Sequence, residues 1–431
     1  MKDDTRRIEV DLALGADVAH VGSLYFVQQK GVELASFEYA SSWLSSDVKF
    51  SIDPELQLSP SRQYPEKGLF GCFQDASPDR WGRNLIQRDY KRMLEENRGR
   101  ARTLPESAYL MSVADMLRMG ALRFREGNVY QAPLRDGVPK LEHLSAFYEK
   151  IRRYQENREE NGDLRDILDP GSSLGGARPK LALTDAGGKK LFIGKFPSVN
   201  DRIDNPLWEK VSLDLAQNCG LRVPSSRLAS LPDRRHALIV ERFDRKDGAR
   251  IHFVSAMTLL GARDGEQDHG YLDLAEQIQA DSVCPGQDLE EMWKRLLFNV
   301  LTCNRDDHLR NHGFLRLSGG WQLSPVYDLE SDCTKAAHSL ALDENGDREP
   351  NPKTVLDVSE YFGISQAKAF SMFRAMSEEI AQWKRLALRY GATASDISEM
   401  SANYTMFAGQ RLHQVSETIE GHSPTLGAPT P

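Results

Sequence analysis

The chain has 431 residues, enough for two or three domains, and its 40% hydrophobic and 27% charged content is that of a globular protein. Its formal net charge of -8 argues against binding nucleic acid through one extended basic surface, because phosphate neutralisation requires clustered Lys and Arg. The five cysteines are scattered without a C-x-x-C pair, which argues against a disulfide scaffold or zinc ribbon. The N-terminus is too polar for a signal peptide, and no stretch approaches the roughly 18 apolar residues of a membrane span, so we expect a cytoplasmic protein.

The first third of the chain begins with predicted strands. Runs at Ile8–Leu14, His20–Gln28 and Leu34–Tyr39 mix apolar and polar positions and are separated by glycine-containing turns. A helix is predicted from Pro78 to Met93, with Ser77 as a possible N-cap. Further helices are predicted from 107 to 124 and from 142 to 168.

The predicted secondary structure then changes from helices to strands, and after residue 250 back to helices. A glycine-rich turn at 171–180 leads into a strand, a hairpin turn begins at Asp185, and further strands cover 190–197 and 236–243. After residue 250 the chain is mostly helical, with a long helix at 365–390 and another that begins at a capping box, Thr393-x-x-Asp396.

This order predicts an α+β fold with two lobes. We expect a β-rich N-terminal subdomain with helices at 1–130, a smaller lobe with the glycine-rich loop at 131–248, an all-helical C-terminal lobe at 249–420 and a disordered tail at 421–431.

Two motifs suit the binding of phosphate groups. The segment Gly171-Ser-Ser-Leu-Gly-Gly-Ala-Arg-Pro-Lys180 lets backbone N–H groups approach phosphate oxygens, and its lysine adds positive charge. Lys195 lies in the apolar strand Leu191-Phe-Ile-Gly-Lys-Phe-Pro197, where an unpaired ammonium would be costly to bury. Taken alone, the glycine-rich segment could be an ordinary turn, and Lys195 could be an edge-strand lysine that points to solvent.

Two further motifs supply carboxylates and an amide. Asn304-Arg-Asp-Asp-His-Leu-Arg-Asn311 follows an amphipathic helix and places Asp306 five residues before Asn311, the spacing of a kinase catalytic loop. Asp328 follows in Ser324-Pro-Val-Tyr-Asp-Leu-Glu330, where kinases place a second, metal-binding aspartate. Glycine-rich loop, strand lysine, Asp-x4-Asn and downstream aspartate appear in the order that phosphoryl transfer requires.

At these residues the chain resembles the HipA family. The family's motifs appear as SLGGARPK, as Ile193-Gly-Lys-Phe-Pro, as the hinge motif Val240–Arg245, as N-x-D-x-H-x-x-N and as P-x-Y-D. Upstream, the segment ending in Pro78-Asp-Arg-Trp-Gly-Arg83 resembles the family's L-P-D-x-W-G-R segment. The resemblance covers residues 20–420.

The resemblance implies a role for each matched residue. Asp306 would be the catalytic base, with Asp307 still possible, and Asn311 and Asp328 would bind the metal. Ser173 matches the family's autophosphorylated serine, although Ser172 beside it leaves the assignment open, and its modification would switch the enzyme off. Nucleotide-binding residues would be Ser173, Gly175, Gly176, Ala177, Lys180, Lys195, Glu241, Phe243, His308, Asn311 and Asp328.

The resemblance also implies a biological role. The chain would be an ATP- and Mg²⁺-dependent serine/threonine-protein kinase that acts as the toxin of a type II toxin–antitoxin pair. Its substrate would be an aminoacyl-tRNA synthetase, with the glutamate enzyme favoured. Its partner would be a HipB-like helix-turn-helix antitoxin that binds operator DNA, so that the chain itself meets DNA only indirectly.

Three other readings compete with this one. A metal-dependent hydrolase could use Asp306, Asp307, His308 and His312, but it leaves Lys195 and the glycine-rich loop unexplained. A catalytically weak kinase fold could serve as a binding module for the antitoxin and DNA. A small-molecule kinase would share the same catalytic residues, and only substrate tests separate it from a protein kinase.

Overall fold

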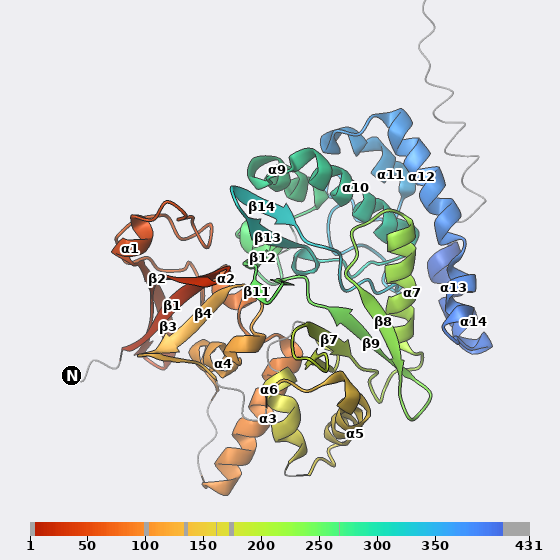
Figure 1. Cartoon of the computed structure of the whole chain (residues 1–431). Coiled ribbons are helices and arrows are strands. Elements are labelled where there is room, and N and C mark those ends of the chain that lie inside the picture. Colours follow the sequence, from red (N-terminus) through yellow and green to blue (C-terminus); the bar gives the residue numbers. More distant parts are fainter. Residues whose placement is uncertain are drawn as a thin grey trace, which may run out of the picture.

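The computed structural model describes residues 5–98, 103–132, 137–160, 162–171, 176–266 and 268–407 (Figure 1). An antiparallel sheet with strand order β3-β2-β1-β4-β5 opens the chain. Its strands are β1 (Arg6–Leu14), β2 (Asp17–Gln29), β3 (Val32–Tyr39), β4 (Leu122–Glu126) and β5 (Val129–Tyr130). The predicted strands are confirmed, because alternate residues such as Ile8, Val10 and Leu12 bury their side chains on one face.

The helices that follow differ in part from the prediction. They are α1 (Ser41–Leu44), α2 (Gly71–Asp75), α3 (Arg80–Glu96), α4 (Glu106–Ser112) and a 3-10 turn at Asp115–Leu117. The helix predicted for 107–124 ends at Ser112, because Gly120 turns the chain with φ +71° and Leu122 then pairs with Leu12 of β1. The suggested N-cap of α3 was also wrong. Asp79 caps the helix, while the Ser77 hydroxyl donates to the Phe73 carbonyl.

A second sheet, with order β6-β7-β9-β8, forms the core of the smaller lobe. Its elements are α5 (Leu144–Gln155), α6 (Asp163–Gly171), β6 (Lys180–Thr184), β7 (Leu191–Lys195), α7 (Asn205–Asn218), β8 (Ser226–Ser230) and β9 (His236–Glu241), with a 3-10 turn at Leu141–His143. The helix predicted for 142–168 is divided at Asn157, whose φ of +54° no continuous helix allows. β7 lies inside the sheet, so Lys195 is not an edge-strand residue.

Helix α3 belongs to the N-terminal third of the chain, yet it packs on the smaller lobe. Figure 1 shows it beside α6. Trp81 and Leu85 of α3 share one buried cluster with Ile151 of α5, Ile167 of α6 and Leu181 of β6. The helix therefore covers the lobe that carries the glycine-rich motif.

The C-terminal lobe is mainly helical, but the expectation that it is all-helical was wrong. An antiparallel sheet of order β12-β13-β14 lies within it, because residues 313–323 form a hairpin that pairs with Phe253–Ser255. Its elements are β12 (Phe253–Ser255), α8 (Ala256–Leu259), α9 (Tyr271–Asp281), α10 (Pro285–Leu301), β13 (Gly313–Leu317), β14 (Gly320–Leu323), α11 (Pro352–Asp357), α12 (Gln366–Ile380), α13 (Trp383–Arg389) and α14 (Ala394–Thr405), with 3-10 turns at Leu309–Asn311 and Ser359–Phe362.

Two predictions for this lobe can be compared with the structure. The helix expected at 365–390 is present as α12 and α13, and the capping box of Thr393 and Asp396 at the start of α14 is confirmed. The expected tail at 421–431 lies outside the described residues. The proposed boundaries at 130 and 248 stay predictions. Among the described helices, none combines the length and apolar character that crossing a membrane requires.

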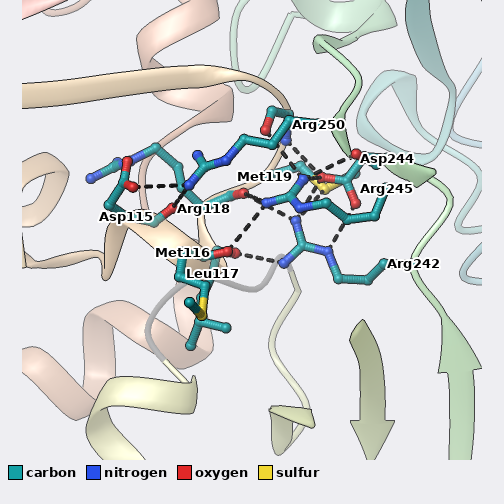
Figure 2. A network of polar contacts seen from close by, with 10 residues as sticks. Asp115, Met116, Leu117, Arg118, Met119, Arg242, Asp244, Arg245 and Arg250 are labelled. Carbon is teal, nitrogen blue, oxygen red and sulfur yellow. Dashed lines mark hydrogen bonds and ion pairs between the residues drawn. The ribbon is translucent and has the colours of Figure 1, made fainter. Parts of the chain in front are cut away.

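The hinge motif fastens the N-terminal part of the chain to the smaller lobe (Figure 2). The Asp244 carboxylate is fully buried and accepts hydrogen bonds from Arg242, from Arg245 and from the backbone N–H of Gly120. The Arg242 guanidinium also donates to the carbonyls of Leu117 (2.6 Å) and Arg118 (3.1 Å). The short strands β10 (Arg245–Lys246) and β11 (Ala249–Arg250) follow directly.

The charge balance of this network can be read from its pKa shifts. Burial alone would raise the pKa of Asp244, but Arg242 and Arg245 outweigh it and lower that pKa to about 2. Asp244 is therefore ionised at neutral pH, and its charge balances one of the two positive charges of Arg242 and Arg245.

Candidate functional site

A cavity of about 740 Å³ lies where the smaller lobe, α3 and the C-terminal lobe meet. Strands β7 and β9 supply one wall, the start of α3 a second, and the segments at 308–311 and 327–328 a third. The structure brings eight of the predicted residues to this cavity: Gly176, Lys180, Lys195, Glu241, Phe243, His308, Asn311 and Asp328.

The other predicted residues are not at the cavity wall. Ala177 is exposed and does not line it. Asp306 also lies outside the lining, with a side chain that is 53% exposed. Ser173 and Gly175, together with Ser172, lie outside the described residues, so their assigned roles stay predictions.

Lys195 forms the charged centre of the cavity. Its ammonium pairs with Glu209 of α7 at 2.5 Å and with Asp328. Burial alone would lower the pKa of Lys195, but Asp328 and Glu209 outweigh burial and raise it. Burial alone would raise the pKa of the Asp328 carboxyl group, but the positive charges of Lys195 and Lys180 outweigh burial and lower it. Both groups are therefore charged at neutral pH.

Asp328 has an unusual backbone conformation. Its φ of +57° lies in the left-handed region, which residues with a Cβ rarely adopt. Such conformations persist where the surrounding structure determines them, and they cluster at binding and catalytic sites. Here the conformation accompanies a carboxylate that is held between Lys195 and the cavity.

Carboxylates around Asp328 offer a candidate cation site. Ligand atoms of Glu209, Asp328 and Glu330 lie within 4.8 Å of one another. Glu330 also pairs with Arg178 of the glycine-rich segment at 3.2 Å. Carboxylate oxygens are the ligands that Mg²⁺ prefers, so the donor set fits this ion.

Lys180 and Gly176 lie close to Asp328, because a Cβ placed on Gly176 would lie 3.7 Å from Asp328 Oδ2. Lys180 is 5% exposed, and no carboxylate of the described residues lies within ion-pair distance of its ammonium. Burial lowers the pKa of Lys180, and Asp328 only partly opposes this shift. A buried cation without a close anionic partner is suited to accept one from a ligand.

Gly176 has φ +88°, and a Cβ placed there would lie 2.5 Å from the Lys180 Nζ. We expect Gly176→Ala to displace this ammonium and to weaken the binding of Mg·ATP about 10- to 100-fold, since a hydrogen bond to a charged group contributes about 1.5–3 kcal/mol. Isothermal calorimetry measures the effect. Gly188→Ala is the matched control, because Gly188 has φ +66° but no atom within 4 Å of the added Cβ. Equal affinities of the two variants would contradict the assigned position of Lys180.

Part of the cavity lining is aromatic. The Phe243 ring packs on the rings of Tyr327 and Phe253, with centroid separations of 5.6 Å and 6.1 Å. Glu241, the last residue of β9, pairs with Lys190 at 2.8 Å. An aromatic wall beside an exposed strand end can take a flat heterocycle and hydrogen-bond its edge.

The two neighbouring aspartates of the catalytic-loop motif lie in opposite environments. Asp307 is buried and accepts hydrogen bonds from Tyr271 and from the His312 ring at 2.7 Å. Burial alone would raise the pKa of Asp307, but His312 and Tyr271 outweigh it and lower it. Asp306 is exposed and pairs with Lys335, while its carbonyl accepts from the Asn311 amide at 3.3 Å. Asp307 thus holds the loop in place, whereas the side chain of Asp306 is accessible from solvent.

Several residues of the site were missed from the sequence. Glu209 lies in Asn205-Pro-Leu-Trp-Glu-Lys-Val211, and an acidic residue among buried helix positions could have indicated it. Glu330 was part of a quoted motif but received no role. Asp79 lines the cavity and carried no signal beyond its place in the D-x-W-G-R segment.

Comparisons with known proteins agree with this geometry. Residues 172–384 match the model of the HipA-like C-terminal domain, and residues 15–100 match that of the HipA N-terminal domain. The serine/threonine-protein kinase toxin HipA of Shewanella oneidensis is 29% identical over 192 residues, which are 38% of this chain and 43% of that protein. The matched region thus spans less than half of the length of this curated relative.

A solved structure extends the similarity to nearly the whole chain. It is the complex of HipA, HipB and operator DNA from the Shewanella oneidensis MR-1 toxin–antitoxin system, which matches with a TM-score of 0.66 at 20% identity. The match covers 92% of this chain and 95% of that one and shows a common fold. With the N-terminal and C-terminal family models matched in this order along the sequence, the chain belongs to the HipA family.

Proposed function

We propose that the chain is a protein kinase that transfers the γ-phosphoryl group of Mg·ATP to a serine or threonine. The observation that carries this proposal is the ion-paired group of Lys195, Glu209 and Asp328 at the cavity. Kinases use a strand lysine paired with a helix glutamate, and a separate aspartate for the metal, to hold the nucleotide phosphates. Family membership supports the same reaction.

Different residues of the cavity would bind different parts of the nucleotide. Lys195 and Lys180 would bind its phosphates, and Glu241 and Phe243 would border the adenine. Asp328 and Asn311 would hold Mg²⁺, with Glu330 as a further carboxylate within reach. When bound, the metal neutralises phosphate charge. His308 lines the same cavity and would face the nucleotide.

Asp306 is the proposed catalytic base. It would accept the proton of the acceptor hydroxyl as the oxygen attacks the γ-phosphorus and the bond to the leaving ADP oxygen breaks. Lys335 pairs with this carboxylate and orients it. Asp307 is not a suitable base, because its carboxylate is buried and its Oδ2 already accepts hydrogen bonds from Tyr271 and His312.

Self-inhibition is a further part of the proposal. A phosphate on Ser173, or on Ser172 beside it, would add negative charge next to the Lys180 segment. It would compete with the ATP phosphates for the same cations and so switch the enzyme off.

The biological role follows from the family. We propose that the chain acts in the cytoplasm as the toxin of a type II toxin–antitoxin pair. It would inhibit translation by phosphorylating an aminoacyl-tRNA synthetase, with the glutamate enzyme favoured. This inhibition would promote persistence. A HipB-like antitoxin would be its partner, because the relative of similar fold was solved with HipB and operator DNA. The net charge of -8 agrees with DNA contacts made through the antitoxin.

One observation favours the alternative of a catalytically weak binding module. Asp306 is exposed and paired with Lys335, and it does not line the cavity. In that case the chain would retain the fold to hold the antitoxin. The metal-dependent hydrolase has less support, because Asp307 and His312 are buried and bonded to each other.

Calorimetry with Mg·ATP tests the nucleotide site directly. We expect the wild type to bind Mg·ATP, and Lys195→Met to bind it about 10- to 100-fold more weakly, since a hydrogen bond to a charged group contributes about 1.5–3 kcal/mol. Lys353→Met is the control, because Lys353 is exposed and pairs with Asp357 away from the cavity. No binding by the wild type would favour the binding module.

A further inference from the structure

Two parts of the glycine-rich segment 171–180 contact α3. At its start, Gly171 packs so closely on α3 that an added Cβ would lie 2.7 Å from Leu85 Cδ1 and 3.1 Å from the Trp81 indole nitrogen. In its second half, Gly176 and Lys180 are hydrogen-bonded to residues at the start of the same helix. These contacts join parts of the chain that are about ninety residues apart in sequence.

The bonds between Gly176 and α3 are reciprocal. The Gly176 N–H donates to Asp79 Oδ2 at 2.6 Å, and the Trp81 backbone N–H donates to the Gly176 carbonyl at 3.0 Å. The Trp81 indole N–H donates to the carbonyl of Lys180 at 2.9 Å. The backbone on either side of residues 177–179 is therefore fixed by α3.

Asp79 serves both the helix and the glycine-rich segment. Its Oδ1 accepts the Arg80 N–H at 2.7 Å and caps α3, while its Oδ2 accepts the Gly176 N–H. One carboxylate thus sets the position of Gly176 relative to the helix. Since the Gly176 N–H is already bonded to Asp79, this glycine contributes to the cavity through its conformation and not as a donor to phosphate.

The position of Gly176 in turn controls Lys180. The space that a side chain of Gly176 would occupy holds the Lys180 ammonium, and Asp328 Oδ2 lies 3.7 Å from the same Cβ position. A displacement of Gly176 or of the Lys180 backbone would move this ammonium. Binding of an anionic group at Lys180 therefore depends on α3, which belongs to the N-terminal third of the chain.

We propose that Asp79 and Trp81 are positioning residues for phosphate binding, and that α3 forms part of the nucleotide site. The inference rests on the proposed function, because it takes the ligand at Lys180 to be the phosphate chain of ATP. It also implies that the C-terminal part of the chain without α3 has a defective phosphate site.

Asp79→Asn isolates this role. The two N–H groups bond to different oxygens of Asp79, and asparagine replaces one of these oxygens with an NH2 group that donates, so in this geometry it can keep only one of the two bonds. We expect the affinity for Mg·ATP to fall about tenfold, as for the loss of one hydrogen bond to a charged acceptor. The affinity for adenosine should stay the same, because the adenine end of the cavity is formed by Glu241 and Phe243. Calorimetry with both ligands on the full chain measures the two affinities.

The matched control is Asp396→Asn. Asp396 also accepts a backbone N–H at a helix start, from Thr393 at 3.0 Å, but it lies in α14 away from the cavity. Should Asp79→Asn fail to fold, Trp81→Phe keeps a buried aromatic ring and removes the donor to the Lys180 carbonyl together with part of the indole. This variant should also have a lower affinity for Mg·ATP and an unchanged affinity for adenosine.

Each outcome bears on a different statement. Unchanged affinity for Mg·ATP in Asp79→Asn, or an equal loss for ATP and adenosine, would overturn the positioning role while the kinase proposal stands. A wild type that binds adenosine and ATP equally would overturn the phosphate site itself. A wild type that binds neither would refute the proposed function, and the inference with it.

Discussion

Asp306→Asn should lower the rate of phosphoryl transfer about 10²- to 10⁴-fold, the usual contribution of a general base. Asparagine keeps the size of the side chain but cannot accept a proton. The affinity for Mg·ATP should stay unchanged, because Asp306 does not line the cavity. Rapid-quench measurement of phosphate incorporation into the chain gives the rate, and calorimetry gives the affinity.

Two variants control for this prediction. Asp332→Asn removes a nearby carboxylate that only accepts from Thr334, so transfer should continue at the wild-type rate. Asp307→Asn should lower the thermal stability, because it disturbs the buried bonds to Tyr271 and His312. A transfer rate within a few-fold of wild type in Asp306→Asn would remove this residue from the mechanism.

Asp244→Ala should lower the free energy of unfolding by about 3–5 kcal/mol, the usual cost of removing one partner from a buried ion pair. The change leaves the buried Arg242 and the largely buried Arg245 without their anion, and Gly120 without its acceptor. This loss is a large part of the roughly 5–15 kcal/mol that stabilises a typical domain. Urea unfolding monitored by tryptophan fluorescence measures it.

Asp357→Ala is the matched control for this variant. Asp357 pairs with Lys353 on the surface, where both side chains are more than half exposed, so its removal should cost about 0–1 kcal/mol. If Asp244→Ala unfolds at the same urea concentration as Asp357→Ala, the hinge network does not fasten the N-terminal part of the chain. Limited proteolysis should also cut Asp244→Ala faster near residues 115–120.

Much of the site could be predicted because its residues lie in short motifs. Lys195, Asn311 and Asp328 stand in strand and loop segments whose spacing the reaction restricts, and the structure brings them to one cavity. The choice of Asp306 over Asp307 rested on spacing alone. The structure adds a physical reason, since Asp307 is buried and hydrogen-bonded to Tyr271 of α9 and to His312.

The remaining features depend on contacts between distant parts of the chain. The bond between Asp79 and Gly176 joins residues 97 positions apart, and no periodicity indicates such a pair. Glu209 of α7 pairs with Lys195 of β7 through the tertiary fold, and the sequence alone does not indicate this contact. Helix lengths were overestimated where a single residue with positive φ, such as Asn157, interrupts an otherwise regular pattern.

Self-phosphorylation tests the central claim most directly. The phosphatase-treated wild-type chain is incubated with ATP, with and without Mg²⁺, and its intact mass and phosphorylation sites are determined by mass spectrometry. We predict the gain of a phosphate on Ser173 or Ser172 that requires Mg²⁺ and is absent in Asp306→Asn. Mg·ATP binding without a gained phosphate would keep the nucleotide site and discard the inhibitory switch. An unchanged mass together with no binding of Mg·ATP would contradict the assignment of this chain as an active kinase.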